Sequence, residues 1–577
     1  MNQTGAALLI EVLKAEKVEI LFGFPGGVVI PAFDALYGEK AIRLVLTRHE
    51  QGAVHAADGY ARSTGRVGAC LVTSGPGATN TVTGLATANF DSVPLVVITG
   101  QVARTMIGND AFQEADIVGI SRSVTKHNYL VNDRRDLGRI LREAFHIART
   151  GRPGPVLVDI PKDVLTEASS EPLPETISIR GYNPVYQCDP LQTRKAVQSL
   201  ANARRPLFYV GGGINISGAA HLFRELIDRT GVPVVSSLMG ISVIPSDHPR
   251  FLGMLGMHGT YAANMAVQSC DLLFAIGSRF DDRATGDLKR FAPHAAVVHV
   301  DIDPSSISRN VPVEVPIIGD ARLFLESFLP FVRPPLIRDW QAQTEEWVRS
   351  HPLAEVPGNG GLSPSQVIRS IAEVFPSAII TTEVGQNQMW TAQYYRFHEA
   401  RTFLTSGGLG TMGYGFPAAI GAQLGNPDRR VVDIAGDGSI QMNIQELGTA
   451  VSEKLPVIVA ILNNGYLGMV RQWQQAFHER RYSGVCLGRH VDCPPDCSQP
   501  QDMCPPYAPD FVKLAQAYGA VGIKVTDPSE IASALHEAAR VTDTPVFLDF
   551  HISREANVWP MVPAGAGIDQ MMSGERE

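Results

Sequence analysis

The chain has 577 residues, of which 45% are apolar and 19% charged, a composition that supports several buried cores and excludes an extensively disordered protein. Its 49 basic and 58 acidic side chains give a formal charge of −9 without any block of lysine and arginine, so neither a nucleic acid nor an anionic membrane is an expected partner. Seven cysteines and the lack of a bilayer-spanning apolar run predict a cytoplasmic protein with reduced thiols.

The first part of the chain alternates apolar, strand-like runs with helical patterns. The runs lie at 20–22, 42–46, 67–72, 94–99 and 155–160. Near-continuous apolar strands between helices are typical of parallel sheets that are covered on both faces. We therefore expect an α/β domain over residues 1–168, followed by a linker that reaches about residue 190.

The same alternation resumes twice. A central domain over 190–333 is predicted from apolar runs at 206–214, 233–237, 271–278 and 296–303. A C-terminal domain over 364–555 is predicted from runs at 378–385, 431–439, 456–464 and 545–550, and a tail of 556–577 follows. The predicted architecture is three doubly wound α/β domains in series, each built on a parallel sheet.

Two polar clusters follow neighbouring strands of the third block. One strand leads into the GDGS motif at 436–439, a helix is predicted over 440–453, and the next strand ends in Asn463-Asn464. A lone GDG is usually a tight turn, but open α/β sheets bind ligands at the carboxyl ends of their strands. Oxygen atoms suit a hard divalent cation, and glycines let backbone N–H groups approach phosphates. Asp437, the Asn464 side chain and a backbone carbonyl near Tyr466 are therefore the candidate Mg²⁺ ligands.

Glu50 is a second candidate, in the segment Arg48-His49-Glu50 that follows the strand at 42–46 and opens a predicted helix. A glutamate in this position is commonly only a favourable charge at a helix start, and the local sequence does not separate that explanation from a functional one.

The GDG and NN motifs, some two dozen residues apart, resemble the metal and diphosphate signature of thiamine-diphosphate enzymes. The resemblance implies that Glu50 hydrogen-bonds N1′ of the aminopyrimidine ring and is the essential acid/base residue. It also implies that the coenzyme lies between a domain like the first block and one like the third. In the superfamily these come from different subunits, so a homo-oligomer, at least a dimer, is implied.

Longer motifs narrow the resemblance to the acetohydroxyacid synthase (acetolactate synthase) family, biosynthetic catalytic subunits. They are GFPGG at 23–27, RHEQGAVHAADGYAR at 48–62, TSGPGATN at 73–80, DAFQE at 110–114, GRPGPVLVD at 151–159, GMLGMHG at 253–259, GSRFDDR at 277–283, SGGLGTMGYGFPAA at 406–419 and LGMVRQWQ at 467–474. The resemblance covers nearly the whole chain. It implies a transferase that uses thiamine diphosphate, Mg²⁺ and FAD, and the family usually has a separate small regulatory subunit.

The implied reaction belongs to valine, leucine and isoleucine biosynthesis. Pyruvate is decarboxylated, and the hydroxyethyl unit held on thiamine condenses with pyruvate or 2-ketobutyrate to give 2-acetolactate or 2-aceto-2-hydroxybutyrate. Two other functions fit parts of the sequence. An FAD-dependent pyruvate oxidase would pass the electrons to the flavin instead, and an inactive paralogue would only bind and serve as a scaffold.

The resemblance also assigns side chains to the active site. Met412 would wedge between the two cofactor rings, Arg283 would pair with the acceptor carboxylate, and Trp473 would favour 2-ketobutyrate as acceptor. Met412 and Trp473 have a plainer explanation as packing, and Lys126, which is also implied, has one as a solvated charge. The other implied catalytic residues are Gly26, Gly27, Phe112, Gln113 and Lys126. The implied contacts to thiamine diphosphate, besides Glu50, are Val384, Gly385, Gln386, Asn387, Gly410, Met412, Gly436, Asp437, Gly438, Ser439, Asn464 and Tyr466.

The central block carries three features at strand ends that fit an FAD site in this family: GGG at 211–213, GSRFDDR, and VDID at 300–303. A glycine-rich turn alone would be weak evidence for a nucleotide. Because carboligation has no net redox change, the flavin would be largely structural. The implied contacts are Arg152, Gly211, Gly212, Gly213, Leu255, Gly256, Met257, His258, Gly277, Arg279, Asp281, Arg283, Asp301, Ile302 and Asp320.

A cysteine-rich insert at 485–508 departs from the family pattern. It contains Cys486, Cys493, Cys497 and Cys504, and thiolates are good ligands for Zn²⁺ or an iron–sulfur cluster. The spacing lacks a C-x-x-C pair, and the prolines suit a rigid loop. A metal site, a plain thiol-containing loop and a redox disulfide all stay open.

Overall fold

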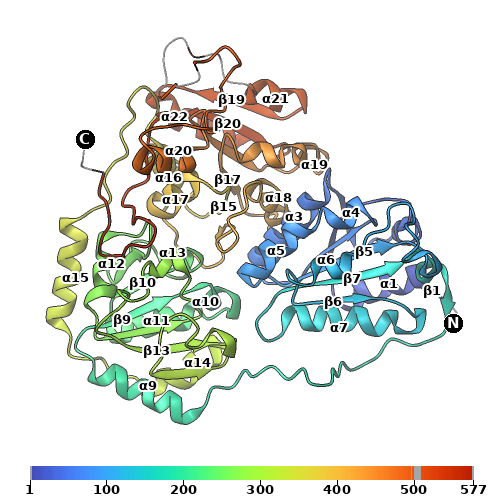
Figure 1. The fold of residues 1–577 in the computed structure, drawn as a ribbon, viewed down its shortest axis with the longest axis horizontal. Helices are drawn as coiled ribbons and strands as arrows, with labels where there is room; N and C mark the ends of the chain where they lie inside the picture. The colour runs from blue at the N-terminus through green and yellow to red at the C-terminus, as the bar shows by residue number, and fades with distance from the viewer. Residues whose placement is uncertain (1–2, 495–496, 499–503, 505–508, 575–577) are drawn as a thin grey trace.

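The computed structural model describes residues 3–494, 497–498, 504 and 509–574. Within these residues, three six-stranded parallel sheets follow one another along the chain, and helices cover both faces of each sheet (Figure 1). The predicted fold class of three doubly wound α/β domains is confirmed. No helix in the described ranges has the length and apolar character needed to cross a membrane.

The N-terminal sheet has the strand order β3-β2-β4-β5-β7-β6. Its strands are β2 (Ile20–Phe24), β3 (Arg43–Leu46), β4 (Gly68–Val72), β5 (Leu95–Gln101), β6 (His127–Leu130) and β7 (Pro155–Pro161). The accompanying helices are α1 (Gly5–Ala15), α2 (Ile30–Leu36), α3 (Glu50–Thr64), α4 (Pro76–Thr79), α5 (Val82–Asp91), α6 (Ile117–Ser121), α7 (Leu137–Arg149) and α8 (Lys162–Thr166). The winding reverses between β2 and β4, which makes their carboxyl ends the expected ligand position.

The central sheet has the order β11-β10-β9-β12-β13-β14, the arrangement of dinucleotide-binding folds. Its strands are β9 (Pro206–Val210), β10 (Val234–Ser236), β11 (Phe251–Met254), β12 (Leu272–Ile276), β13 (Ala296–Asp301) and β14 (Val315–Ile318). The helices are α9 (Pro190–Asn202), α10 (Gly212–Ser217), α11 (Ala220–Thr230), α12 (Tyr261–Ser269), α13 (Asp282–Thr285), α14 (Ala321–Phe328) and α15 (Arg338–Ser350). The winding reverses between β9 and β12.

The C-terminal sheet has the order β16-β15-β17-β18-β20-β19. Its strands are β15 (Ile379–Thr382), β16 (Phe403–Leu404), β17 (Val431–Gly436), β18 (Ile458–Asn463), β19 (Val521–Val525) and β20 (Val546–His551). The helices are α16 (Pro364–Val374), α17 (Gln386–Tyr394), α18 (Gly415–Gly425), α19 (Leu447–Ser452), α20 (Gly468–Phe477), α21 (Phe511–Ala517) and α22 (Ile531–Arg540). Counted within each domain, this order is the same as that of the N-terminal sheet, and the winding reverses between β15 and β17.

A two-stranded pair closes the N-terminal domain, and an irregular segment leads from it to the central domain. β1 (Gln3–Thr4) pairs antiparallel with β8 (Ala168–Ser169), and residues 170–189 contain neither helix nor strand.

The helix predicted over 440–453 is wrong in its first half, where two 3-10 turns, Ile440–Met442 and Ile444–Glu446, precede α19. Asn443 lies between these turns with non-helical backbone angles, and its side chain donates a hydrogen bond to the Gly413 carbonyl at 2.6 Å.

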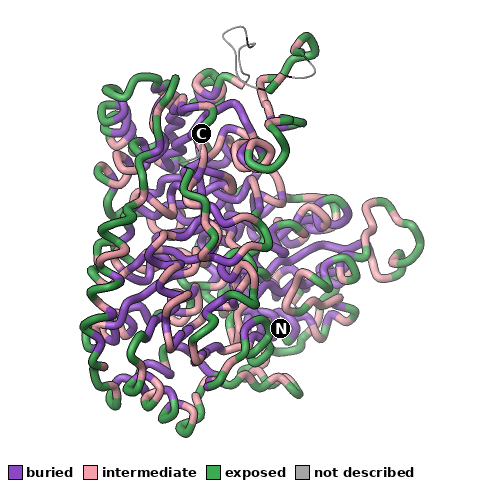
Figure 2. The backbone as a smooth tube through the Cα atoms, turned by 60° about the vertical axis from the view of Figure 1, so that its left-hand side comes forward, coloured by how far each residue is buried: buried purple, intermediate pink, exposed green. Residues whose placement is uncertain are grey.

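Helices α3 and α18 bind the N-terminal and C-terminal domains of the chain to each other. A Cβ atom on Gly59 would collide with the Ala418 backbone, and one on Gly421 would collide with the Ala56 backbone. Both helices are buried along most of their length. Figure 2 shows that buried residues make up the interior of the molecule. Glycine therefore allows the two helix backbones to touch, and this contact fixes the two domains relative to each other.

Candidate active site

A cavity of about 1280 Å³ lies at the carboxyl ends of the strands of the central and C-terminal sheets. Its walls include residues that follow β9, β12, β15 and β17, the strands at which the winding of each sheet reverses. Such reversal points are where open α/β sheets bind ligands. The volume exceeds the roughly 1,000 Å³ upper range of sites for single small ligands. The cavity therefore has room for more than one cofactor or substrate.

The C-terminal wall of this cavity carries the candidate metal ligands. The buried Asp437 carboxylate accepts the N–H of Asn464 at 3.4 Å and the N–H of Gly465 at 3.0 Å. The Asn464 side-chain oxygen accepts the N–H of Tyr466 at 3.0 Å. Each of the implied thiamine-diphosphate contacts except Glu50 lines the cavity, from Val384 to Tyr466. A carboxylate, an amide oxygen and a backbone carbonyl are ligands that Mg²⁺ prefers, so the donor set fits this ion.

The opposite wall belongs to the central domain. All of the implied FAD contacts except Gly211 and Gly256 line the cavity. These two glycines lie behind the wall, where a Cβ on Gly211 would meet the Gly277 carbonyl and one on Gly256 would meet the Arg283 carbonyl. They allow close packing of the strand ends and do not face the cavity.

A polar group on the central wall is left for a ligand to satisfy. Among the described residues, the side-chain oxygen of Asn215, which lines the cavity, is buried without a hydrogen-bond partner. Asp301 ends β13 on the same wall, and burial raises the pKa of its carboxyl group to about 6. Because buried polar atoms in proteins nearly always have partners, this wall fits a polar ligand such as a nucleotide.

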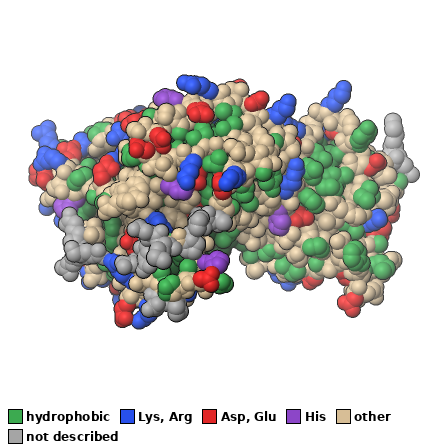
Figure 3. Space-filling view, turned by 90° about the horizontal axis from the view of Figure 1, so that it is seen from above, with side chains coloured by type: hydrophobic (Ala, Val, Ile, Leu, Met, Phe, Trp, Pro, Cys, Tyr) green, Lys and Arg blue, Asp and Glu red, His purple; other side chains and the backbone are tan. Residues whose placement is uncertain are grey.

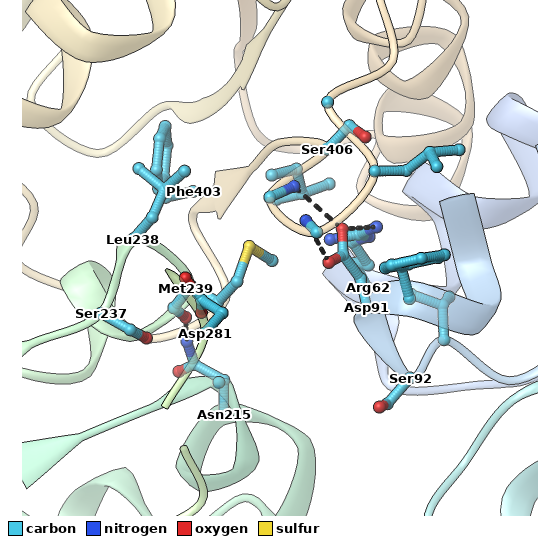
Figure 4. Close-up of a pocket in the computed structure, with 18 of the residues that line it drawn as sticks. Arg62, Asp91, Ser92, Asn215, Ser237, Leu238, Met239, Asp281, Phe403 and Ser406 are labelled. Carbon is cyan, nitrogen blue, oxygen red and sulfur yellow. Dashed lines mark hydrogen bonds and ion pairs between the residues drawn. The ribbon is translucent and has the colours of Figure 1, made fainter. Parts of the chain in front are cut away.

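A buried ion network connects the N-terminal domain to the cavity (Figure 4). No motif in the sequence indicated this network. Arg62 on α3 donates to Asp58 at 2.5 Å, to Asp91 at 3.0 Å and to the Thr405 carbonyl at 2.9 Å. The Asp91 carboxylate also accepts the N–H groups of Gly407 at 3.0 Å and Gly408 at 2.8 Å. The network thus holds the loop at 405–413, which carries Met412.

Glu50 lies elsewhere, at the reversal point of the N-terminal sheet. It is the first residue of α3, is 8% exposed, and accepts the Asn80 side-chain N–H at 2.9 Å. Gly75 to Gly77 form the turn beside it. A Cβ on Gly77 would lie 3.3 Å from the Glu50 carboxylate, and one on Gly75 would collide with the Gln113 backbone.

The other residues implied for the pyrimidine side are near this turn or exposed. Gly26 abuts Thr73, the space beside Gly27 is open, and Phe112 is 88% exposed. None of Glu50, Gly26, Gly27, Phe112 and Gln113 is among the residues that line the large cavity. Within one chain, the structure therefore does not bring Glu50 to Asp437 and Asn464.

Lys126 also lies outside the cavity wall. Its ammonium group donates to the carbonyls of Ile147 and Thr150, at 2.6 and 2.5 Å, and to the Tyr182 hydroxyl at 2.9 Å. Burial lowers its pKa to about 8. The two carbonyls belong to the C-terminal end of α7, where a cation is favourable, so the observed contacts of Lys126 are those of a helix cap.

The acceptor-side residues are on the cavity wall. Arg283 is exposed beside Met257, and Trp473 on α20 packs against Phe477 with ring centroids 5.4 Å apart. Arg283 follows Asp281, whose carboxylate caps the start of α13. Both side chains belong to helices that begin a short loop after a strand end, α13 after β12 and α20 after β18.

Part of the cysteine-rich insert lies outside the described residues, although its four cysteines lie within them. The described residues hold no group of three or more His, Cys, Asp or Glu side chains placed to bind a metal ion, and the four thiols form no disulfide. The structure therefore gives the metal hypothesis no support. The insert begins beside the candidate Mg²⁺ site, because Leu467 donates to the Val485 carbonyl and Leu487 to the Gly465 carbonyl.

Profiles of one family match all three domains. Those described as thiamine pyrophosphate enzyme, N-terminal TPP binding domain, central domain and C-terminal TPP binding domain match residues 3–120, 193–328 and 383–550. Together with the fold and the cavity, these matches define a thiamine pyrophosphate (thiamine diphosphate) enzyme.

Relatives that match the chain over its full length show to which family of thiamine pyrophosphate enzymes it belongs. The acetolactate synthase isozyme 3 large subunit of Escherichia coli is 46% identical, with 100% of this chain and 99% of the relative covered. The acetolactate synthase large subunit of Haemophilus influenzae is 44% identical, with 99% and 98% covered, and that of Mycobacterium tuberculosis is 47% identical, with 99% and 91% covered. The chain belongs to the acetolactate synthase large-subunit family.

Proposed function

We propose that the chain converts two molecules of pyruvate into 2-acetolactate and CO₂, and pyruvate with 2-ketobutyrate into 2-aceto-2-hydroxybutyrate and CO₂. The observation that carries this proposal is the convergence of Asp437, Asn464 and Tyr466 on one cavity wall, in a chain that belongs to this family over its full length. Bound thiamine diphosphate supplies the carbon nucleophile and the electron sink that decarboxylation requires.

The residues of the chain would bind Mg²⁺ and thiamine diphosphate and orient the coenzyme. Asp437, the Asn464 side chain and the Tyr466 carbonyl would hold Mg²⁺ against the diphosphate, with backbone N–H groups at 436–439 close by. Glu50 would hold a proton at N1′ of the aminopyrimidine ring. Met412 would support the bent cofactor. The buried position of Asp437 excludes water and strengthens the attraction between its carboxylate and the cation.

The substrates would be held by two side chains of the cavity wall. The Arg283 guanidinium is planar and pairs well with the carboxylate of the acceptor 2-keto acid. Trp473 would limit the acceptor pocket and favour the longer side chain of 2-ketobutyrate through apolar contact. Both side chains line the same cavity as Asp437.

FAD is the second proposed cofactor, bound on the central wall. The strand order of the central sheet, the glycines after β9 and the unpartnered Asn215 oxygen support it. Because the reaction is redox-neutral, the flavin would serve the structure of the site. Anaerobic bleaching of the flavin by pyruvate at the turnover rate, without acetolactate, would instead favour a pyruvate oxidase.

The third part of the proposal is a homo-oligomer in which Glu50 serves the cavity of a partner subunit. Glu50 is not among the residues that line the cavity of its own chain, which supports this arrangement. So do the exposed Phe112 side chain and the hydrophobic patches over the N-terminal domain, on the right of Figure 3. A small regulatory subunit is a further proposed partner.

Complementation between inactive variants tests the shared site. We expect Glu50→Gln and Asp437→Ala enzymes each to be inactive alone. Random mixing makes half of the dimers mixed, with one intact site of two, so activity should return to about a quarter of the wild-type value. No recovery, after mass spectrometry has shown that subunits exchange, would place both residues in one subunit's site.

Product analysis tests the reaction itself. Pyruvate plus 2-ketobutyrate should give both acetohydroxy acids with thiamine diphosphate and Mg²⁺ present, and neither product without them. Failure to release CO₂ from pyruvate when thiamine diphosphate, Mg²⁺ and FAD are all present would leave only a binding paralogue.

A further inference from the structure

Glu446 joins the C-terminal domain to the start of the helix that carries Glu50. It ends the second 3-10 turn after the GDGS motif and is 1% exposed. One carboxylate oxygen accepts the N–H groups of Arg48 at 3.0 Å and His49 at 2.9 Å. The other accepts the same Arg48 N–H at 3.1 Å and the Thr449 hydroxyl at 2.6 Å. The two backbone donors belong to the residues immediately before Glu50.

The surrounding residues allow this contact and reinforce it. A Cβ on Gly52, in the first turn of α3, would overlap the Glu446 carboxylate, so only glycine leaves room for it. At the same contact between the N-terminal and C-terminal domains, the Arg48 guanidinium donates to the Gly448 carbonyl at 3.2 Å and the Ser452 hydroxyl at 3.0 Å. Hydrogen bonds thus cross this contact in both directions.

Stability alone does not account for a carboxylate in this position. Burial raises the pKa of Glu446 to about 7, which means that the charged form of the carboxyl group costs free energy in the folded protein. An apolar side chain would pack between the domains without that cost. The carboxylate does what an apolar group cannot, because it fixes two N–H groups at the point where α3 begins.

We propose that Glu446 is a positioning residue for Glu50, holding the backbone of Arg48 and His49 so that the Glu50 carboxyl group meets the aminopyrimidine ring in the correct place. This inference rests on the proposed role of Glu50. Glu446 acts through the backbone and touches neither substrate nor cofactor.

The test compares binding of the whole coenzyme with binding of its diphosphate end alone. Glu446→Gln keeps the shape of the side chain but removes its charge. Its NH2 group cannot accept the Thr449 hydroxyl and the Arg48 N–H, which both donate to the second carboxylate oxygen at 2.6 and 3.1 Å. We expect the affinity for thiamine diphosphate to fall about tenfold, or about 1.4 kcal/mol. The affinity for inorganic diphosphate with Mg²⁺, which needs only the Asp437 half, should stay within about twofold, because that half is unchanged.

Hydrogen exchange gives a readout that is independent of activity. In the cofactor-free Glu446→Gln protein, the amides of residues 48–53 should exchange faster than in the wild type. The matched control is Glu453→Gln, which removes an ion pair of 2.5 Å to Arg43 across the same two domains and should change neither exchange nor affinity. Glu446→Asp keeps the charge on a shorter side chain and should show a smaller loss in the same direction.

Three outcomes overturn the proposal. The first is unchanged exchange at 48–53 in both the Gln and the Asp variants. The second is an equal loss of affinity for thiamine diphosphate and for inorganic diphosphate, which would make Glu446 a support of the metal loop. The third is an effect of Glu453→Gln as large as that of Glu446→Gln. Glu50→Gln keeps the two proposals apart, because wild-type affinity and turnover in that variant would refute the role of Glu50 itself.

Discussion

The network of Arg62, Asp58 and Asp91 predicts that a charge in the N-terminal domain controls a loop of the C-terminal domain. Replacing Asp91 by Asn removes the charge that balances Arg62 and one of the acceptors for the N–H groups of Gly407 and Gly408. Breaking a buried ion pair by changing one partner costs about 3–5 kcal/mol. Because Arg62 keeps its contact with Asp58, we expect about 3 kcal/mol, near the lower end of that range.

Local hydrogen exchange is the appropriate assay, since a chain with three domains does not unfold in a single two-state step. A loss of about 3 kcal/mol corresponds to somewhat more than a hundredfold faster exchange of the amides at 405–413. The affinity for thiamine diphosphate should fall as well, because the same loop carries Gly410 and Met412. Asp303→Asn is the control, since Asp303 of the central domain pairs at 3.0 Å with Arg152 of the N-terminal domain and, among the described residues, makes no hydrogen bond to the loop at 405–413. Exchange at 405–413 that rises less than threefold would refute the reasoning.

Three further outcomes are expected. Asp437→Ala removes the carboxylate of the proposed Mg²⁺ site and should weaken Mg²⁺-dependent binding of thiamine diphosphate by on the order of 100-fold in calorimetry, while flavin absorbance of the purified protein is retained. Trp473→Leu should keep acetolactate formation and lose the preference for 2-ketobutyrate, and unchanged product ratios in competition would contradict the assignment. Lys126 has a lowered pKa of about 8 in the folded protein, so the unfolded chain binds more protons between that value and its ordinary pKa near 10.5. Stability relative to Lys126→Met should therefore rise from pH 8 to pH 10 in thermal melts, and a flat difference would count against the buried ammonium group.

The sequence predicted the inner strands of each sheet but, of the edge strands, only β3. β4, β9, β12 and β18 are buried at every position, which is why they appear as apolar runs. The missed strands include β6 and β19, which lie at sheet edges and are mostly only half-buried. An edge strand with one solvated face needs few apolar residues, so composition alone does not distinguish it from a loop.

The part of the site that lies in one segment of the sequence was predicted from its motifs, whereas contacts between distant segments were not predicted. The residues around Asp437 and Asn464 belong to one strand–helix–strand unit, β17, α19 and β18, and they line one cavity wall as the spacing indicates. Asp91 lies more than 300 positions before Gly407 in the sequence, and nothing in either segment identifies the other as its partner. Glu446 was also missed, because its partners Arg48 and His49 lie in a distant segment. In addition, the segment that contains Glu446 was predicted as a regular helix.

The N-terminal and C-terminal sheets share one strand order but carry different chemistry at their reversal points. Beside β2 and β4 lie a carboxyl group, glycines and little charge, whereas beside β15 and β17 lie the oxygen donors for a cation. Helices α3 and α18 pack backbone to backbone within the chain, and Glu446 ties the same two domains beside Glu50. These contacts make the spacing between the two half-sites of one chain a fixed property of the fold. Two such chains related by a two-fold axis could therefore complete both sites by rigid docking, since neither half-site has to change its own geometry.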